Sequence, residues 1–121
     1  MNMTEPGAAK RRLNADRNEA LGYLADLERD FAAIVTSASE GSVGGDDEHD
    51  PEGATIAFER QHLAALISQA REHLEAIDAA LRKIDSGKYE ICDKCGGPIG
   101  AERLAARPAA VTCVNCARTR R

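Results

Sequence analysis

The chain has few of the large aromatic side chains that usually fill a globular core: two Phe, two Tyr and no Trp in 121 residues. Alanine dominates its apolar content, and this composition favours long helices packed in pairs over a thick core. No apolar run approaches the roughly 20 residues that span a bilayer, and residues 1–10 lack the apolar stretch of a signal peptide. We therefore expect a cytoplasmic protein with no membrane partner.

Cysteine is also scarce, and all four cysteines fall into two Cys-x-x-Cys pairs, Cys92 with Cys95 and Cys113 with Cys116. Two such turns can direct four thiolates at one ion, which is the arrangement that structural zinc prefers. An iron-sulfur cluster could use the same ligands, but the spacing favours zinc. Four thiolates leave no open position for water. The pattern therefore predicts one structural Zn²⁺ and no metal-based chemistry.

The first half of the chain predicts a helix over residues 8–39. Its apolar residues recur at steps of three and four and form one stripe, which comprises Leu13, Leu21, Leu24, Leu27, Phe31, Ile34 and Val35. Gly22 interrupts this pattern, at a cost of about 1 kcal/mol relative to alanine. It marks either a close helix approach or a tolerated position.

A second helix is predicted from about Pro51 to Ser86, where Ser86 and Gly87 end it. Its apolar residues alternate steps of four and three, as in a heptad seam, and comprise Leu63, Ile67, Ala70, Leu74, Ile77, Leu81 and Ile84. Residues 40–53 between the helices carry acidic side chains and no Lys or Arg. Asp50 fits the N-cap of the second helix.

These elements predict an all-α fold, a long antiparallel coiled-coil hairpin followed by a four-cysteine zinc-finger module. The expected organisation is a flexible N-terminus over residues 1–7, the hairpin over 8–86 with an acidic tip loop at 40–53, and the finger with a basic tail over 87–121. No Ser/His/Asp grouping, phosphate-binding loop or dinucleotide motif is present. We therefore do not expect an enzyme.

The sequence around the cysteines resembles the DksA/TraR family of C4 zinc-finger proteins over about the last third of the chain. The resemblance rests on the segments Gly87–Cys92, Cys95–Gly96, Pro98–Ile99, Arg103–Leu104, Ala106–Ala109 and Cys113–Cys116. It implies a finger that caps a long coiled coil. It also implies a regulator of transcription that binds bacterial RNA polymerase.

The resemblance further implies a role for the acidic segment, because in the family the end of the coiled coil enters the secondary channel of the polymerase and modulates initiation. The residues that would modulate the polymerase here are Asp46, Asp47, Asp50 and Glu52. The family's Asp-x-x-Asp-x-Ala pattern is matched in neither possible register. The first acid is kept and the second is lost or displaced.

Some family members help to bind guanosine tetraphosphate at the polymerase interface through basic residues of the coil and finger. Arg107 falls on one such position, which makes it a candidate contact to the nucleotide or to the polymerase. The other positions fall on Gln69, His73, Ala76 and Ala117, which are poor phosphate ligands at neutral pH. The sequence therefore gives little support for a response to this nucleotide.

A sequence-specific DNA-binding zinc finger is the alternative function, because the cysteine spacing is close to that of GATA-type fingers and residues 118–121 are basic. Residues 96–112 between the pairs, however, lack aromatic side chains and have only Arg103 and Arg107 as cations, which suits groove reading poorly. The acidic segment would also repel phosphates. The sequence therefore favours polymerase binding over direct DNA binding.

Overall fold

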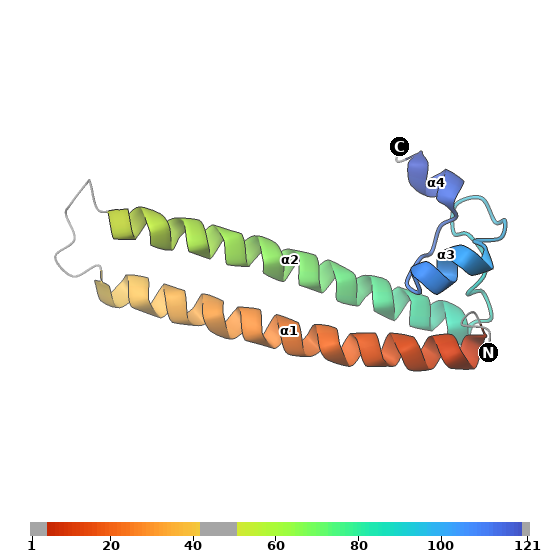
Figure 1. Cartoon of the computed structure of the whole chain (residues 1–121), viewed down its shortest axis with the longest axis horizontal. Coiled ribbons are helices and arrows are strands. Elements are labelled where there is room, and N and C mark those ends of the chain that lie inside the picture. Colours follow the sequence, from red (N-terminus) through yellow and green to blue (C-terminus); the bar gives the residue numbers. More distant parts are fainter. Residues whose placement is uncertain (1–4, 42–50, 120–121) are drawn as a thin grey trace. The chain divides into compact units, whose positions relative to one another are not determined.

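The computed structural model describes residues 5–41 and 51–119, and within these ranges the fold is helical with no strand. One isolated antiparallel bridge joins Ile91 and Pro98. The helices, shown in Figure 1, are α1 (Pro6–Gly41), α2 (Pro51–Asp85), α3 (Ala101–Ala106) and α4 (Val114–Arg118). The two long helices begin and end close to the predicted residues.

The C-terminus of α2 is closed by a turn that requires glycine. Gly87 has a φ of 74°, a region that residues with a Cβ rarely enter. The Gly87 N–H donates to the Ile84 carbonyl at 3.1 Å, and the Lys88 N–H donates to the Lys83 carbonyl at 2.8 Å. These two bonds form the Schellman pattern of a helix end. The predicted stop at Ser86 and Gly87 is thus confirmed.

The chain packs as two compact units. One comprises the chain up to Glu19 together with His73 onward, and we call it the finger unit; the other, Ala20–Glu72, we call the hairpin unit. Each unit therefore contains part of α1 and part of α2. The predicted division into an N-terminus, a hairpin over residues 8–86 and a finger stays a prediction, and residues 42–50 of the expected tip loop lie outside the described part.

The hairpin unit has a thin apolar core between its segments of α1 and α2. Leu27, Ile67 and Ala70 are buried at its centre, and four half-buried residues pack around them: Leu24, Phe31, Leu63 and Leu66. The Arg71 guanidinium donates to the Glu28 carboxylate at 3.0 Å across the pair. Both partners are largely exposed, so this ion pair contributes about 1 kcal/mol at most.

In the finger unit the start of α1 packs against the end of α2. Leu13 and Ile77 are almost completely buried, together with Ala9, Leu74 and Ala80. Lys10 pairs with Asp85 at 3.2 Å and Arg17 with Asp78 at 2.8 Å. Because the residue numbers rise on one helix as they fall on the other, the two segments are antiparallel. The predicted fold class is confirmed.

The predicted apolar stripes are largely confirmed. Every member of the α2 seam is buried or half-buried, and so are Leu13, Leu24, Leu27, Phe31 and Ile34 of α1. The prediction is wrong for two members of the α1 stripe, because Leu21 and Val35 are each 40% exposed. An added Cβ at Gly22 would meet nothing within 4 Å, so this glycine marks no close helix approach.

None of the described helices is both long and apolar enough to cross a membrane.

Candidate metal centre

The first cysteine pair lies in a tight turn that follows α2. The Cys92 N–H donates to the Gly97 carbonyl at 2.8 Å, and the Gly96 N–H donates to the Cys92 carbonyl at 3.0 Å. Gly96 makes this closure possible with a φ of 74°. The turn leaves Cys92 buried and Cys95 exposed.

The second pair lies at the start of α4, where Cys113 is the N-cap residue with extended backbone angles. Cys116 follows within the first helical turn, so both thiols lie at the same helix end. The Asp93 N–H donates to the Val111 carbonyl at 2.8 Å. This bond holds the first cysteine turn beside the segment that leads into the second cysteine pair.

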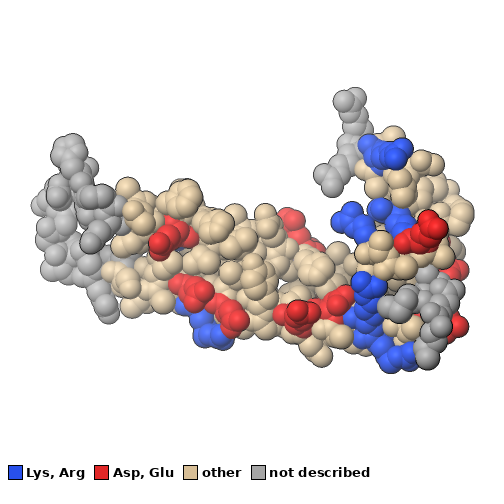
Figure 2. Space-filling view, in the orientation of Figure 1, with Lys and Arg blue, Asp and Glu red and all other residues tan. Residues whose placement is uncertain are grey.

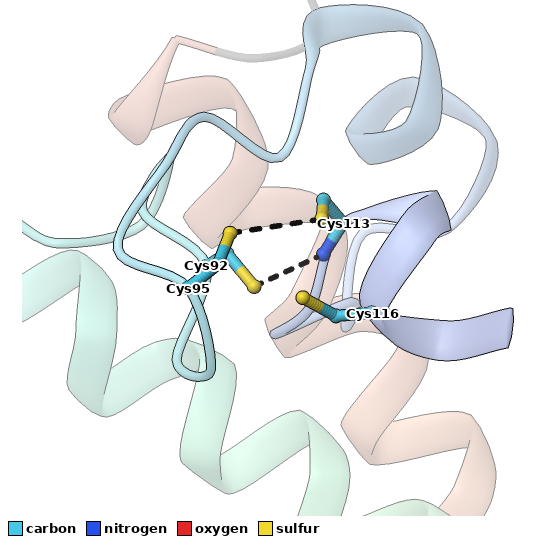
Figure 3. Close-up of side chains that lie close together, drawn as sticks. All are labelled: Cys92, Cys95, Cys113 and Cys116. Atoms are coloured by element: carbon cyan, nitrogen blue, oxygen red, sulfur yellow. Dashed lines mark hydrogen bonds between the residues drawn. The ribbon is translucent and has the colours of Figure 1, made fainter. Parts of the chain in front are cut away.

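The four cysteine side chains converge from these two turns (Figure 3). Their sulfur atoms all lie within 4.8 Å of one another, and the Sγ atoms of Cys95 and Cys113 are 3.9 Å apart. Four sulfurs bound about 2.3 Å from a zinc ion would be about 3.8 Å apart in a tetrahedron. The donor set and its spacing therefore fit one zinc ion with little rearrangement.

Backbone N–H groups point at the sulfurs and would stabilise thiolates there. The Cys113 N–H donates to Cys92 Sγ at 3.3 Å and the Gly97 N–H donates to Cys95 Sγ at 3.4 Å. The first of these bonds, drawn in Figure 3, runs from one cysteine pair to the other. The backbone thus helps to arrange the site before any ion is bound.

The thiol pKa values show how charge is distributed in the metal-free cluster. Backbone N–H groups, first that of Cys95, lower the pKa of Cys92 to about 6 even though burial opposes this. The Cys116 N–H likewise lowers the pKa of Cys113. Because the Cys116 thiol shares its proton with the sulfurs of Cys113 and Cys92, its own pKa rises to about 12. Cys92 therefore takes up negative charge first and Cys116 last.

A small core supports the metal centre. Tyr89, Ile99 and Leu104 are each at most 5% exposed, and the Tyr89 hydroxyl donates to the Pro108 carbonyl at 2.8 Å. Burial raises the pKa of Tyr89, against the opposing effect of the Arg12 charge, so this hydroxyl keeps its proton. The Arg103 Nε donates to the Thr112 carbonyl at 2.7 Å. These contacts fix the chain between the two cysteine pairs.

Two basic residues of the long helices bind the finger, and the sequence analysis assigned neither of them. Lys83 near the end of α2 donates to the Ile91 carbonyl and pairs with the Asp93 carboxylate at 2.9 Å. Its side chain is only 11% exposed. The Arg12 guanidinium donates to the Ala105 carbonyl at the end of α3 at 2.7 Å. A lysine in the last turn of a helix normally interacts with that helix's own carbonyls, so no local pattern indicated this role.

The finger unit also contains a groove of about 500 Å³ that includes the predicted contact residue Arg107. Three of the four positions discussed with it, His73, Ala76 and Ala117, line the same groove. Gln69, the fourth, belongs to the hairpin unit. Lys94 and Arg103 also line the groove, and they supply cations that the sequence analysis had not assigned there.

The predicted tip acids are not brought to any site by the described structure. Asp46, Asp47 and Asp50 lie outside the described residues. Glu52 lies in the first turn of α2, but its side chain is not described. Their role as residues that modulate the polymerase stays a prediction.

Fold and site together define a class of protein, a C4 metal-binding finger joined to an antiparallel helical hairpin. Residues 87–120 match the family model of the prokaryotic dksA/traR C4-type zinc finger. The chain therefore carries a structural zinc site, and its residues 87–120 match the finger of the DksA/TraR family, as the resemblance indicated.

Similar proteins extend this finding. The chain is 40% identical over 74 residues to the uncharacterized protein YteA of Bacillus subtilis, and this match covers 61% of the chain and 31% of YteA. It is 44% identical over 46 residues to the RNA polymerase-binding transcription factor DksA of Haemophilus influenzae, which covers 38% of the chain and 32% of that protein. The matches thus span about a third of these relatives' own lengths.

A solved structure shows the same fold over nearly the whole chain. The transcription factor DksA2 from Pseudomonas aeruginosa aligns with a TM-score of 0.72 at 22% sequence identity, covering 98% of this chain and 84% of that one. The likeness therefore includes the helices as well as the finger. At this identity it shows the fold alone.

Proposed function

We propose that the protein binds bacterial RNA polymerase and regulates the initiation of transcription. The proposal is carried by one observation, that the finger and the hairpin both have counterparts in proteins of this kind. A relative that is 44% identical over 46 residues is named an RNA polymerase-binding transcription factor, and the fold of nearly the whole chain is that of the transcription factor DksA2. In this proposal the protein acts in the cytoplasm, where the polymerase works.

The proposed mechanism places the acidic end of the hairpin in the secondary channel of the polymerase. Carboxylates there would compete for coordination of the catalytic magnesium or bias the open complex electrostatically. The candidates are Asp46, Asp47, Asp50 and Glu52. The finger has a supporting role, because four thiolates leave no open position on a zinc ion. The protein would thus regulate the polymerase without being an enzyme.

Two features support polymerase over DNA as the partner. The Arg103 side chain, one of the two cations between the cysteine pairs, uses its Nε to bind the Thr112 carbonyl. The segment of residues 40–53, which carries acidic side chains and no Lys or Arg, would repel a phosphate backbone. An electrophoretic mobility assay with duplex DNA is therefore expected to show no sequence-specific complex.

Binding is tested with the zinc-loaded full chain and purified core and holo polymerase on a biosensor surface. Saturable binding is expected, and the Cys116→Ser variant, which cannot complete the thiolate tetrahedron, is expected to bind much more weakly. Wild-type protein that fails to bind either form of the polymerase would end the proposal. Tight binding by DNA alone would support the alternative function.

The acidic segment is tested with the double variant Asp47→Asn and Asp50→Asn. The matched control is Glu72→Gln and Glu75→Gln, which removes two exposed charges from α2. Asparagine is also a comparable N-cap at position 50. Polymerase affinity should change little in both variants, whereas the effect on initiation in a purified transcription assay should fall sharply only in the first. Equal regulation by both variants would contradict a role for the tip carboxylates.

Arg107 is proposed as a contact to the polymerase or to a nucleotide bound at its surface. Its side chain is exposed and lines the groove with Lys94 and Arg103. Arg107→Ala is expected to weaken polymerase binding or regulation, with Lys88→Ala as an exposed basic control. If guanosine tetraphosphate changes regulation equally in wild type and in Arg107→Ala, this residue does not contact the nucleotide.

A further inference from the structure

The hairpin unit has an open groove of about 430 Å³ that the metal centre and the proposed role of the acidic segment do not use. Ala33 and Ile34 of α1 and Phe58 and Leu63 of α2 give it an apolar lining, while Asp30 and Glu59 add one acid from each helix. On the face shown in Figure 2, the surface of this unit is mostly uncharged, with scattered acidic side chains and some basic side chains beside them. The groove therefore combines apolar surface with negative charge.

Phe58 is the most unusual residue of this groove. It is one of two phenylalanines in the chain, yet 70% of its surface is exposed, so it contributes little to the thin core around Leu27 and Ile67. Its ring stacks on the imidazole of His62, with centroids 6.4 Å apart and planes 6° from parallel. A single exposed apolar residue is ordinary, but here a flat aromatic pair borders an apolar groove. Such a combination is typical of an interaction site.

The acids of the groove remain available to a partner. Among the residues that the structure describes, neither Asp30 nor Glu59 has an ion-pair partner within 4.0 Å. The acid Glu28 of the same unit, in contrast, pairs with Arg71. Cations approaching from outside would find two uncompensated carboxylates beside an apolar surface. Complementary charge would fix the orientation of such a partner as well as attract it.

We propose that this groove binds an amphipathic helix of another protein, one that inserts a bulky apolar side chain against Phe58 and places Lys or Arg next to Asp30 and Glu59. Helix-in-groove recognition of this kind uses apolar anchors three or four residues apart, and the stems of long basic side chains can lie along the apolar border. The proposal does not depend on polymerase binding.

A second copy of the chain fits the groove poorly. A two-fold symmetric contact through the groove would place the acidic border of one copy against the acidic border of the other. Of the three arginines in the hairpin unit, Arg29 and Arg71 already pair with Asp26 and Glu28, so among the described residues Arg60 alone is left to face the acids of a second copy. The charge pattern therefore favours a basic partner over self-association.

The test uses a synthetic helical peptide with Leu and Phe spaced four residues apart and flanked by Lys, compared with the same peptide carrying Glu in place of Lys. Its binding to the zinc-loaded full chain is followed by fluorescence anisotropy. Phe58→Ser should weaken binding of the Lys peptide about tenfold, as expected for losing much of an aromatic anchor. Tyr23→Ser is the matched control, since Tyr23 is an aromatic of the same unit that is 50% exposed and does not line the groove.

The charge half of the proposal is tested with the isosteric double variant Asp30→Asn and Glu59→Gln. This variant should bind the Lys peptide about fivefold more weakly at low ionic strength and should lose most of the salt dependence, because surface charges are screened by salt. The Glu peptide should bind poorly to every form. Circular dichroism should show unchanged folding, since all the substituted side chains are exposed.

Two results would overturn the proposal. Equal affinity of wild type and Phe58→Ser for the Lys peptide would show that Phe58 is no anchor. Sedimentation showing a dimer that Phe58→Ser dissociates would assign the groove to a second copy. Neither result depends on whether polymerase binds, so the failure of this proposal and the failure of the proposed function can be told apart.

Discussion

The finger unit and the hairpin unit are stabilised in different ways. In the finger unit, two cysteine pairs, the buried Tyr89 hydroxyl and the half-buried Lys83 tie short loops together through polar contacts. In the hairpin unit, a small apolar cluster centred on Leu27, Ile67 and Ala70 lies between two helices, with exposed ion pairs around it. The finger unit thus adds a metal centre to its own helix seam, whereas the hairpin unit depends on the burial of its narrow seam alone.

This contrast explains why a chain with so few large side chains can fold. A narrow seam of Leu, Ile and Ala is enough for two long helices, because each turn adds another contact of the same kind. Short loops such as residues 87–100 have no such repetition, and their core is too small to order them alone. A metal supplies the missing stability in small modules of this size.

Zinc removal is expected to have the largest effect, and it should affect the finger unit while leaving the hairpin unit folded. Structural zinc contributes on the order of 10 kcal/mol to the folding of such modules. Chelation should therefore disorder residues 87–119, while the helices of residues 20–72 keep their hydrogen-exchange protection. Metal analysis of the untreated protein should give about one zinc per chain. If protection in residues 20–72 is lost together with the finger, the two units are one cooperative structure and the contrast is wrong.

Acid should remove the metal in a predictable direction. The pKa of Cys92 is lowered to about 6, so its thiolate is present at neutral pH and its stabilising effect is lost as pH falls through that value. The pKa of Cys116 is raised to about 12, so zinc binding at neutral pH must displace this proton. Zinc affinity should thus fall as pH falls, most steeply near pH 6 and below. Affinity measured with a zinc-sensitive dye that stays constant from pH 8 to pH 5 would contradict this.

Truncation of the seam should cost less than loss of the metal. Ile77 is 1% exposed in the finger unit and Ile67 is 8% exposed in the hairpin unit. Ile77→Ala should destabilise by about 3 kcal/mol and Ile67→Ala by about 2 kcal/mol, because the thinner hairpin packing can collapse further around the gap. Leu74→Ala should fall in the same range.

The control for the seam is Leu21→Ala. Because Leu21 is 40% exposed, this substitution should lower the free energy of unfolding by well under 1 kcal/mol. Urea unfolding followed by circular dichroism measures all four variants. Equal effects of Leu21→Ala and Ile77→Ala would mean that burial in the seam does not set stability.

The sequence predicted the features that repeat and missed those that depend on tertiary proximity. The steps of three and four located the seam, and glycine and proline located the helix ends. The same periodicity placed Leu21 and Val35 in the stripe, because it cannot tell the centre of a narrow stripe from its edge. Buried Ala9, Ala20 and Ala80 were missed since alanine occurs throughout both helices.

The metal centre shows the same limit. Ligand spacing indicated the four cysteines, because zinc chemistry constrains that spacing directly. The Arg12 contact joins residues 93 positions apart in the sequence, and the Lys83 contact joins residues 8 positions apart across the end of α2. No motif marks either contact. The Phe58 groove was likewise missed, because it arises only when α1 and α2 lie side by side.

The smallest expected effects are those of replacing Gly22 or Gly87 by alanine, and they should have opposite signs. Gly22 lies inside α1 with nothing within 4 Å of an added Cβ, so Gly22→Ala should stabilise the protein by about 1 kcal/mol by improving helix propensity. Gly87 has a φ of 74° with equally open space, so Gly87→Ala should destabilise by about 1 kcal/mol through backbone strain alone. Thermal melts should move in opposite directions, by about 4 °C each. If Gly22→Ala lowers the melting temperature, the exposed face of α1 is in contact with something that an alanine methyl disturbs, and the hairpin unit depends on more than its seam.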